Sequence, residues 1–95
     1  MAGESKLQSK CIKYAKANKV IMRKIHAESS RGWMDTVLIF QGGETIWVEF
    51  KNPVRKCQLS TLQILEHGLV RRQGATVYTC NSFEDFEIII KRHLK

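Results

Sequence analysis

Residues 36–48 read Thr36-Val37-Leu38-Ile39-Phe40-Gln41-Gly42-Gly43-Glu44-Thr45-Ile46-Trp47-Val48, and this stretch decides the fold. It holds two apolar runs, rich in β-branched and aromatic residues, on either side of a glycine pair. Such a pattern predicts a β-hairpin. Asp35 comes directly before the first run and Glu49 directly after the second. Both carboxylates therefore lie at the open end of the predicted hairpin.

The register of this hairpin decides whether Asp35 and Glu49 can meet. A two-residue turn at the glycine pair would place Asp35 opposite Phe50 and turn Glu49 to the other face. A three-residue loop, 41–43, would place Asp35 directly opposite Glu49, because side chains alternate between the faces of a sheet. We predict the three-residue loop, with a glycine in the left-handed region or an equivalent bulge.

Two carboxylates that face each other repel unless a cation lies between them. Oxygen ligands select Mg²⁺ or Mn²⁺, and such an ion activates water and binds phosphate oxygens. Lys51 follows Glu49 by two residues, projects to the same face and could stabilise charge developing on phosphorus. This pattern suggests metal-dependent chemistry on a phosphodiester. The alternative is an ordinary surface Glu–Lys pair, because Glu-x-Lys triplets are common.

The composition favours a single basic domain that spans residues 1–95. Sixteen Lys and Arg residues against nine Asp and Glu give a formal charge of +7, which favours a polyanionic partner, usually nucleic acid. A merely solvated basic surface is the alternative. Three scattered cysteines without a C-x-x-C pair argue against a disulfide framework or a zinc site and favour a cytoplasmic protein. Because no apolar run resembles a signal peptide or a membrane span, we expect no membrane association.

The rest of the chain supplies helices and two further strands. Apolar periodicity and capping signals predict an α-β-β-β-α-β-α order. The elements flanking the hairpin are a helix over about 4–18, a strand over 20–27, a helix over 60–73, a strand over 75–80 and a helix after Ser82. This order indicates an α/β fold with a mixed β-sheet flanked by helices and a βαβ crossover.

The second predicted helix begins with a capping box, Ser60-x-x-Gln63. Its aliphatic residues recur at helical spacing, so we expect them to form the stripe that faces the sheet. They are Leu62, Leu65, Leu69 and Val70.

Several short motifs together closely resemble the virus-type replication-repair nuclease (VRR-NUC) domains of the PD-(D/E)XK nuclease superfamily. They are Arg31-Gly32-x-x-Asp35, Glu49-Phe50-Lys51-x-Pro53, Leu59-Ser60-x-x-Gln63 and Gly74. The resemblance runs from Glu4 to the last helix. Met34 departs from it, because the residue before the aspartate is usually proline. A restriction-endonuclease-like core is the fold that this resemblance implies.

The resemblance also implies roles for individual residues. Asp35, Glu49 and the backbone carbonyl of Phe50 would be metal ligands, with Mg²⁺ or Mn²⁺ as the cofactor. Lys51 would be the catalytic lysine.

Residues outside the hairpin complete the implied site. Glu4 matches an acidic residue that such nucleases often carry near the metal, and its alternative is a favourable charge in the first turn of a helix. Gln63 matches a glutamine near the active site, and its alternative is the capping box. Arg31 would contact phosphate, and Arg55 and Lys56 would bind the DNA backbone.

Stand-alone members of this family resemble homodimeric Holliday-junction resolvases. We therefore expect a metal-dependent, structure-selective DNA endonuclease, a homodimer whose two active sites match the two strands cut in a four-way junction. The resemblance suggests a phage or a bacterial host cytosol as its setting. Two alternatives stay open: the same chemistry on flaps, nicks or ends, and a catalytically silent basic module that only binds DNA.

Overall fold

The computed structural model describes residues 2–26, 32–51 and 59–94, with side chains of the first helix described from Lys6 onward. Seven elements follow one another in the order that the sequence predicts. They are α1 (Ala2–Ala17), β1 (Ile21–Lys24), β2 (Thr36–Ile39), β3 (Thr45–Phe50), α2 (Thr61–Arg72), β4 (Thr76–Cys80) and α3 (Phe83–His93).

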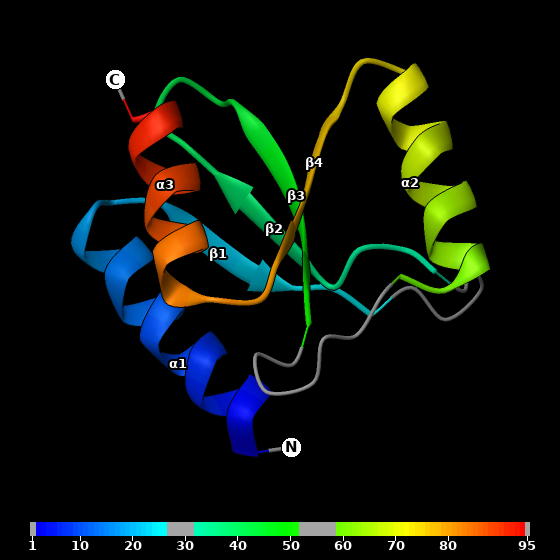
Figure 1. The fold of residues 1–95 in the computed structure, drawn as a ribbon. Coiled ribbons are helices and arrows are strands. Elements are labelled where there is room, and N and C mark those ends of the chain that lie inside the picture. The colour runs from blue at the N-terminus through cyan, green and yellow to red at the C-terminus, as the bar shows by residue number, and fades with distance from the viewer. Residues whose placement is uncertain (1, 27–31, 52–58, 95) are drawn as a thin grey trace.

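The four strands form one mixed sheet in the order β1-β2-β3-β4. The pairs β1–β2 and β2–β3 are antiparallel, while β3 and β4 are parallel and are joined through α2. Helices α1 and α3 pack together on one side, and α2 stands on the other side, next to β4 (Figure 1). The predicted mixed sheet, flanked by helices and containing a βαβ crossover, is confirmed.

The core lies between the sheet and the pair α1–α3. Alternate residues of β3, Ile46, Val48 and Phe50, point into it, and Phe50 lies 5.9 Å from Phe86 of α3 between ring centroids. Each fully buried side chain of this size contributes about 1.5–3 kcal/mol through removal of apolar surface from water. The intervening residues of β3, Trp47 and Glu49, therefore face the α2 side.

The hairpin has the register that brings the two carboxylates together. Thr36 pairs with Val48 and Ile39 with Thr45. The Phe40 N–H donates to the Glu44 carbonyl at 2.9 Å, so the loop consists of residues 41–43. Both of its glycines have φ near +90°. The predicted three-residue loop is confirmed, and continuing this register places Asp35 opposite Glu49.

The start of α2 is as predicted, but the direction of its apolar face is not. Ser60 Oγ accepts the Gln63 N–H at 3.2 Å, and Gln63 Oε1 accepts the Ser60 N–H at 2.9 Å, which completes the capping box. The expected buried stripe is exposed: Leu62, Leu65 and Leu69 are 49%, 59% and 52% accessible. The side chain of Val70 is only partly buried.

The physical reason lies on the opposite side of α2. Gln63 turns toward β3 to make hydrogen bonds there, and His67, one turn later, becomes fully buried. A helix that directs positions 63 and 67 inward must direct the leucines outward.

The two described cysteines are buried free thiols. Burial raises the pKa of Cys11 to about 12 and that of Cys80 to about 11, so both side chains behave as small apolar groups rather than nucleophiles. Cys57 lies outside the described residues. Within the part of the chain that the structure describes, no helix has the length and apolar character needed to cross a membrane.

Gly32 provides a test of how the segment before β2 holds α2 in place. Its φ is +84°, and an added Cβ would lie 2.7 Å from the backbone carbon and oxygen of Leu62. Gly74 has a similar φ of +94°, but nothing lies within 4 Å of an added Cβ. We expect Gly74→Ala to cost about 1–2 kcal/mol from the left-handed backbone alone. Gly32→Ala should cost more, because the start of α2 must move.

Chemical denaturation of both variants measures this difference directly. Equal losses in the free energy of unfolding would contradict a tight contact between Gly32 and α2.

Candidate active site

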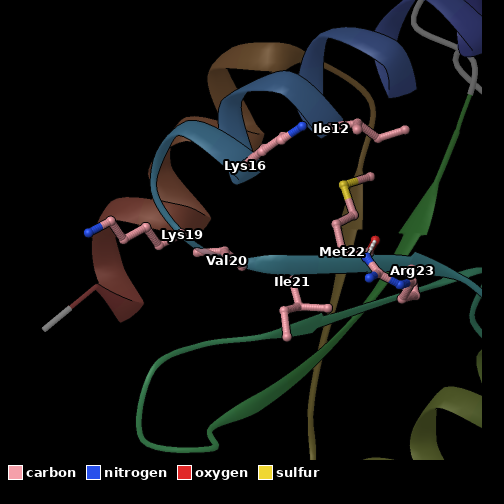
Figure 2. A pocket seen from close by; sticks show the side chains of 7 residues that line it. All are labelled: Ile12, Lys16, Lys19, Val20, Ile21, Met22 and Arg23. Carbon is pink, nitrogen blue, oxygen red and sulfur yellow. Dashed lines mark hydrogen bonds between the residues drawn. The ribbon is translucent and has the colours of Figure 1, made fainter.

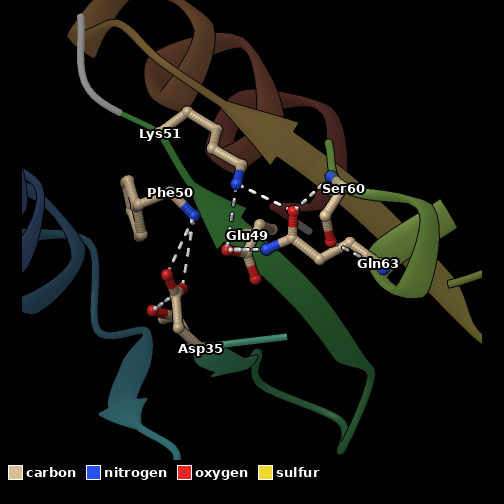
Figure 3. A network of polar contacts seen from close by, with 7 residues as sticks. Asp35, Glu49, Phe50, Lys51, Ser60 and Gln63 are labelled. Carbon is tan, nitrogen blue, oxygen red and sulfur yellow. Dashed lines mark hydrogen bonds and ion pairs between the residues drawn. The ribbon is translucent and has the colours of Figure 1, made fainter. Parts of the chain in front are cut away.

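Four of the predicted site residues lie close together at one end of the sheet. Asp35 directly precedes β2, Glu49 lies near the end of β3, Lys51 follows β3, and Gln63 comes from the first turn of α2 (Figure 3). The hairpin register and the parallel crossover together bring these segments side by side. The candidate site is therefore built from three separate parts of the chain.

Gln63 links the site's lysine to its buried glutamate. Its Oε1 accepts a hydrogen bond from Lys51 Nζ at 2.8 Å, and its Nε2 donates to Glu49 Oε2 at 2.9 Å. The partners fix the orientation of the amide, because an ammonium group can only donate and a carboxylate can only accept. Gln63 therefore completes the capping box and contacts the candidate site at the same time, because the same Oε1 also accepts the Ser60 N–H.

Lys51 and Glu49 form an ion pair that is largely shielded from water. Lys51 Nζ lies 3.9 Å from Glu49 Oε2, and the two side chains are 17% and 8% accessible. Because desolvating two charges is costly, such pairs persist only with further hydrogen bonds, and Gln63 supplies one to each partner. The ammonium group is held in place while keeping donors available for a further acceptor.

Asp35 is held against the backbone of the neighbouring strand. The Phe50 N–H donates to both of its carboxylate oxygens, at 3.3 Å and 3.2 Å, and Thr36 Oγ1 donates to Oδ1 at 2.9 Å. These contacts fix the carboxylate beside Phe50, whose carbonyl belongs to the predicted ligand set.

The donors at this end of the sheet suit a hard divalent cation. Asp35, Glu49 and a backbone carbonyl offer only oxygen, which is the ligand type of Mg²⁺ and Mn²⁺. Among the described side chains, those of residues 6–26, 32–51 and 59–94, no three from His, Cys, Asp or Glu gather as a ready-made metal cage. Two carboxylates with water completing the coordination are typical of Mg²⁺. The residues present therefore fit the predicted ion.

Four predicted residues cannot be placed in the site. The backbone of Glu4 belongs to the first turn of α1, but its side chain is outside the description. Arg31, Arg55 and Lys56 lie outside the described residues. Their roles stay predictions.

His67 is a neighbour of the site that the sequence pattern did not single out. It lies one turn after Gln63 on the inward side of α2 and is completely buried. Burial, with Arg71 and Lys51 nearby, lowers its pKa, and the backbone of Gly32 opposes this only in part. A neutral ring adds no positive charge beside Lys51. The sequence did contain a signal for the burial of His67. Residues four apart share one face of a helix, so an inward-facing Gln63 implies an inward-facing His67.

Basic residues also gather beside β1, a strand at the edge of the sheet. Lys16 of α1, Lys19 of the following turn and Arg23 of β1 line a hollow of about 440 Å³ (Figure 2). Ile12, Val20, Ile21 and Met22 complete its lining, which contains no acidic side chain. Three positive charges thus lie side by side in this hollow with no acidic residue in its lining.

Comparisons with known proteins support the predicted fold. Neither a family model nor a curated protein sequence matches this chain. A solved structure described as a VRR_NUC domain matches it with a TM-score of 0.85 and 25% sequence identity. The match covers 96% of this chain and 97% of that one. The resemblance seen in the motifs is therefore confirmed over nearly the whole structure.

The lowered pKa of His67 predicts a specific loss of stability in mild acid. The unfolded histidine takes up a proton near pH 6.5, while the folded one resists protonation to a lower pH. The unfolded state then binds more protons, so stability falls as the pH drops through 6.5. His67→Leu should remove this dependence between pH 7.5 and 5.5, whereas His26→Leu, at an exposed site, should keep it.

Urea unfolding of the three proteins at both pH values measures the effect. If His67→Leu loses as much stability in acid as the unsubstituted chain, another group is responsible.

Proposed function

We propose that this chain, which has the fold of a VRR-NUC domain, is a metal-dependent, structure-selective DNA endonuclease that hydrolyses phosphodiester bonds. The structural match indicates a nuclease-type domain. The observation that carries the proposal is the hydrogen-bonded network of Lys51, Gln63 and Glu49 beside Asp35. Its charges and oxygen donors are those required for hydrolysis at phosphorus.

Each residue has a distinct part in this proposal. Asp35, Glu49 and the Phe50 carbonyl would hold Mg²⁺ or Mn²⁺, which when bound supplies charge neutralisation and an activated water. Lys51 presents a fixed positive charge to the phosphate, because Gln63 Oε1 holds its ammonium group at 2.8 Å. Gln63 therefore positions the lysine and the glutamate relative to each other.

The same arrangement disfavours a protein that only binds DNA. Carboxylates beside a DNA phosphate repel it when no cation lies between them. Glu49 is 6% exposed and is held by Gln63, so it cannot simply swing away into solvent. A pure binding surface would gain from an uncharged residue at this position.

We further propose that the enzyme is a homodimer that acts on branched DNA, the four-way junction being the expected substrate. A two-fold dimer carries two equivalent active sites, and a four-way junction offers two equivalent strands. Flaps, nicks and free ends are the competing substrates, and a cleavage panel separates them. Paired, symmetric cuts in the four-way junction support a resolvase.

Two substitutions test the chemistry. Glu49→Gln removes a ligand charge, and Lys51→Ala removes the positive charge at the phosphate, so each should lower the cleavage rate about 10²–10³-fold, as loss of one transition-state contact typically does. The measurement is single-turnover cleavage of labelled four-way, flap and duplex DNA with Mg²⁺ or Mn²⁺.

Lys24→Ala, at an exposed lysine on β1, is the matched control and should cleave at the original rate. Binding without cleavage in EDTA, followed by cleavage on adding metal, is also expected. Unchanged cleavage by both site variants would overturn the proposal.

The basic hollow predicts a contribution to DNA binding that is independent of the chemistry. If Lys19 and Arg23 contact phosphates, reversing both charges should weaken binding equally for all sequences and reduce the salt dependence of the affinity. Filter binding in EDTA over a range of salt concentrations measures both quantities.

The control reverses the charges of Lys13 and Lys91, which are exposed and do not line the hollow. It changes the net charge of the chain by the same amount. Equal losses in the two double variants would show a general charge effect rather than a contact in the hollow.

A further inference from the structure

Helix α2 is amphipathic, but its polar side faces inward and its apolar side faces outward, the reverse of a helix that covers a sheet. Its inward side carries Gln63 and the completely buried His67. Its outward side carries aliphatic residues that are about half exposed, Leu62, Ile64, Leu65 and Leu69. Within a single chain this outward face adds nothing to stability in water, because apolar surface that stays hydrated contributes nothing to folding.

The outward face is also hollowed. Gly68 lies among the aliphatic residues, and nothing is found within 4 Å of a Cβ added to it. The hollow has a volume of about 510 Å³, and its remaining lining includes one acidic residue, Glu66, and one basic residue, Arg72. A helix that approaches here could place a large side chain beside Gly68.

We propose that this face of α2, defined by Leu62, Leu65, Gly68 and Leu69, is the surface on which a second copy of the chain docks. The two α2 helices would run antiparallel across a two-fold axis. Such an axis reverses the direction of the helix, so when the helices cross near Leu69, position 66 of one copy lies level with position 72 of the other. Glu66 of each copy would therefore come near Arg72 of the other.

Charge favours a second copy over the other partners considered for a basic protein. The chain carries a formal charge of +7, but the charged residues that line this hollow are one acid and one base. Nucleic acid would be attracted to cations, whereas this face offers it one cation, one anion and aliphatic surface. A second copy of the same face brings an acid to this base and a base to this acid, so two ion pairs can form.

The small size of the chain also favours a second copy as the partner. A chain of 95 residues buries only about 60–70% of its unfolded surface, so an interface between copies is a natural source of further burial. A stable interface buries roughly 800 Å² from each partner, and aliphatic residues at its centre contribute most of its apolar area. Four half-exposed aliphatic residues on one helix supply such a centre.

Docking here would couple the interface to the candidate active site. Gln63, which contacts Lys51 and Glu49, lies on the other side of the same helix. Holding α2 from outside would therefore restrain the group that positions the lysine. This inference rests on the homodimer in the proposed function but not on its chemistry.

The test is the mass of the protein in solution, measured by sedimentation equilibrium. Protein concentrations from about 1 to 100 μM cover the range in which a dimer with a micromolar dissociation constant forms. The chain of 11.0 kDa should sediment at twice that mass. Leu65→Glu should lower the association constant at least 100-fold, because it places a charge at the centre of the face. Ile88→Glu, at an equally exposed aliphatic residue of α3, should leave the dimer intact.

A charge exchange tests the antiparallel arrangement and avoids any doubt about folding. Glu66→Arg should weaken the dimer, and the pair Glu66→Arg with Arg72→Glu should restore it. A monomeric unsubstituted chain, or a dimer unaffected by Leu65→Glu, would overturn the inference.

A parallel cleavage assay keeps the two proposals apart. A dimer of the expected mass that cuts no DNA supports this inference and contradicts the proposed function. Cleavage by a protein that stays monomeric contradicts this inference and the proposed homodimer, and it supports the proposed chemistry.

Discussion

The amide of Gln63 is the interaction on which the rest of this structure depends. It completes the capping box that begins α2, and it connects that helix to Lys51 and Glu49. Hydrogen bonds between strands fix the backbone of Glu49 in β3. The side chains of Glu49 and Lys51, however, take their relative positions from the Gln63 amide. A single side chain therefore sets the start of a helix, the rotation of that helix and the geometry of the candidate site.

This constraint explains the unusual chemistry of α2. Turning Gln63 toward the sheet buries His67 and exposes the leucines, which is the reverse of what burial of apolar surface alone would favour. The Ser60–Gln63 reciprocal contacts and the ion pair oppose this cost, but an exposed aliphatic face remains. Local polar interactions at the site thus outweigh the hydrophobic preference of the helix, and the exposed face is available for contacts between chains.

Much of the fold could be predicted because local patterns agree with the global structure. Spacing and residue type predicted helices α1 and α3, the capping residue Ser60 and the three-residue loop. The meeting of Asp35, Glu49, Lys51 and Gln63 also followed, once the register was fixed. The direction of α2 did not, because periodicity shows which residues share a face but not which face is inward. His67 was missed for the same reason, and the implied contacts of Arg31, Arg55 and Lys56 are not decided by any local pattern.

The loop at residues 41–43 lies at the far end of the hairpin from Asp35, in the kind of exposed turn that normally accepts insertions and deletions freely. The pairing that matters for the site is the one between the strands, not the length of the turn. An added residue leaves Asp35 opposite Glu49 as long as the turn takes it up and Phe40 still pairs with Glu44, whereas a residue that enters one strand moves one carboxylate to the other face of the sheet. Accepted changes in length should therefore be confined to residues 41–43, and the two strands that follow and precede them should keep their length.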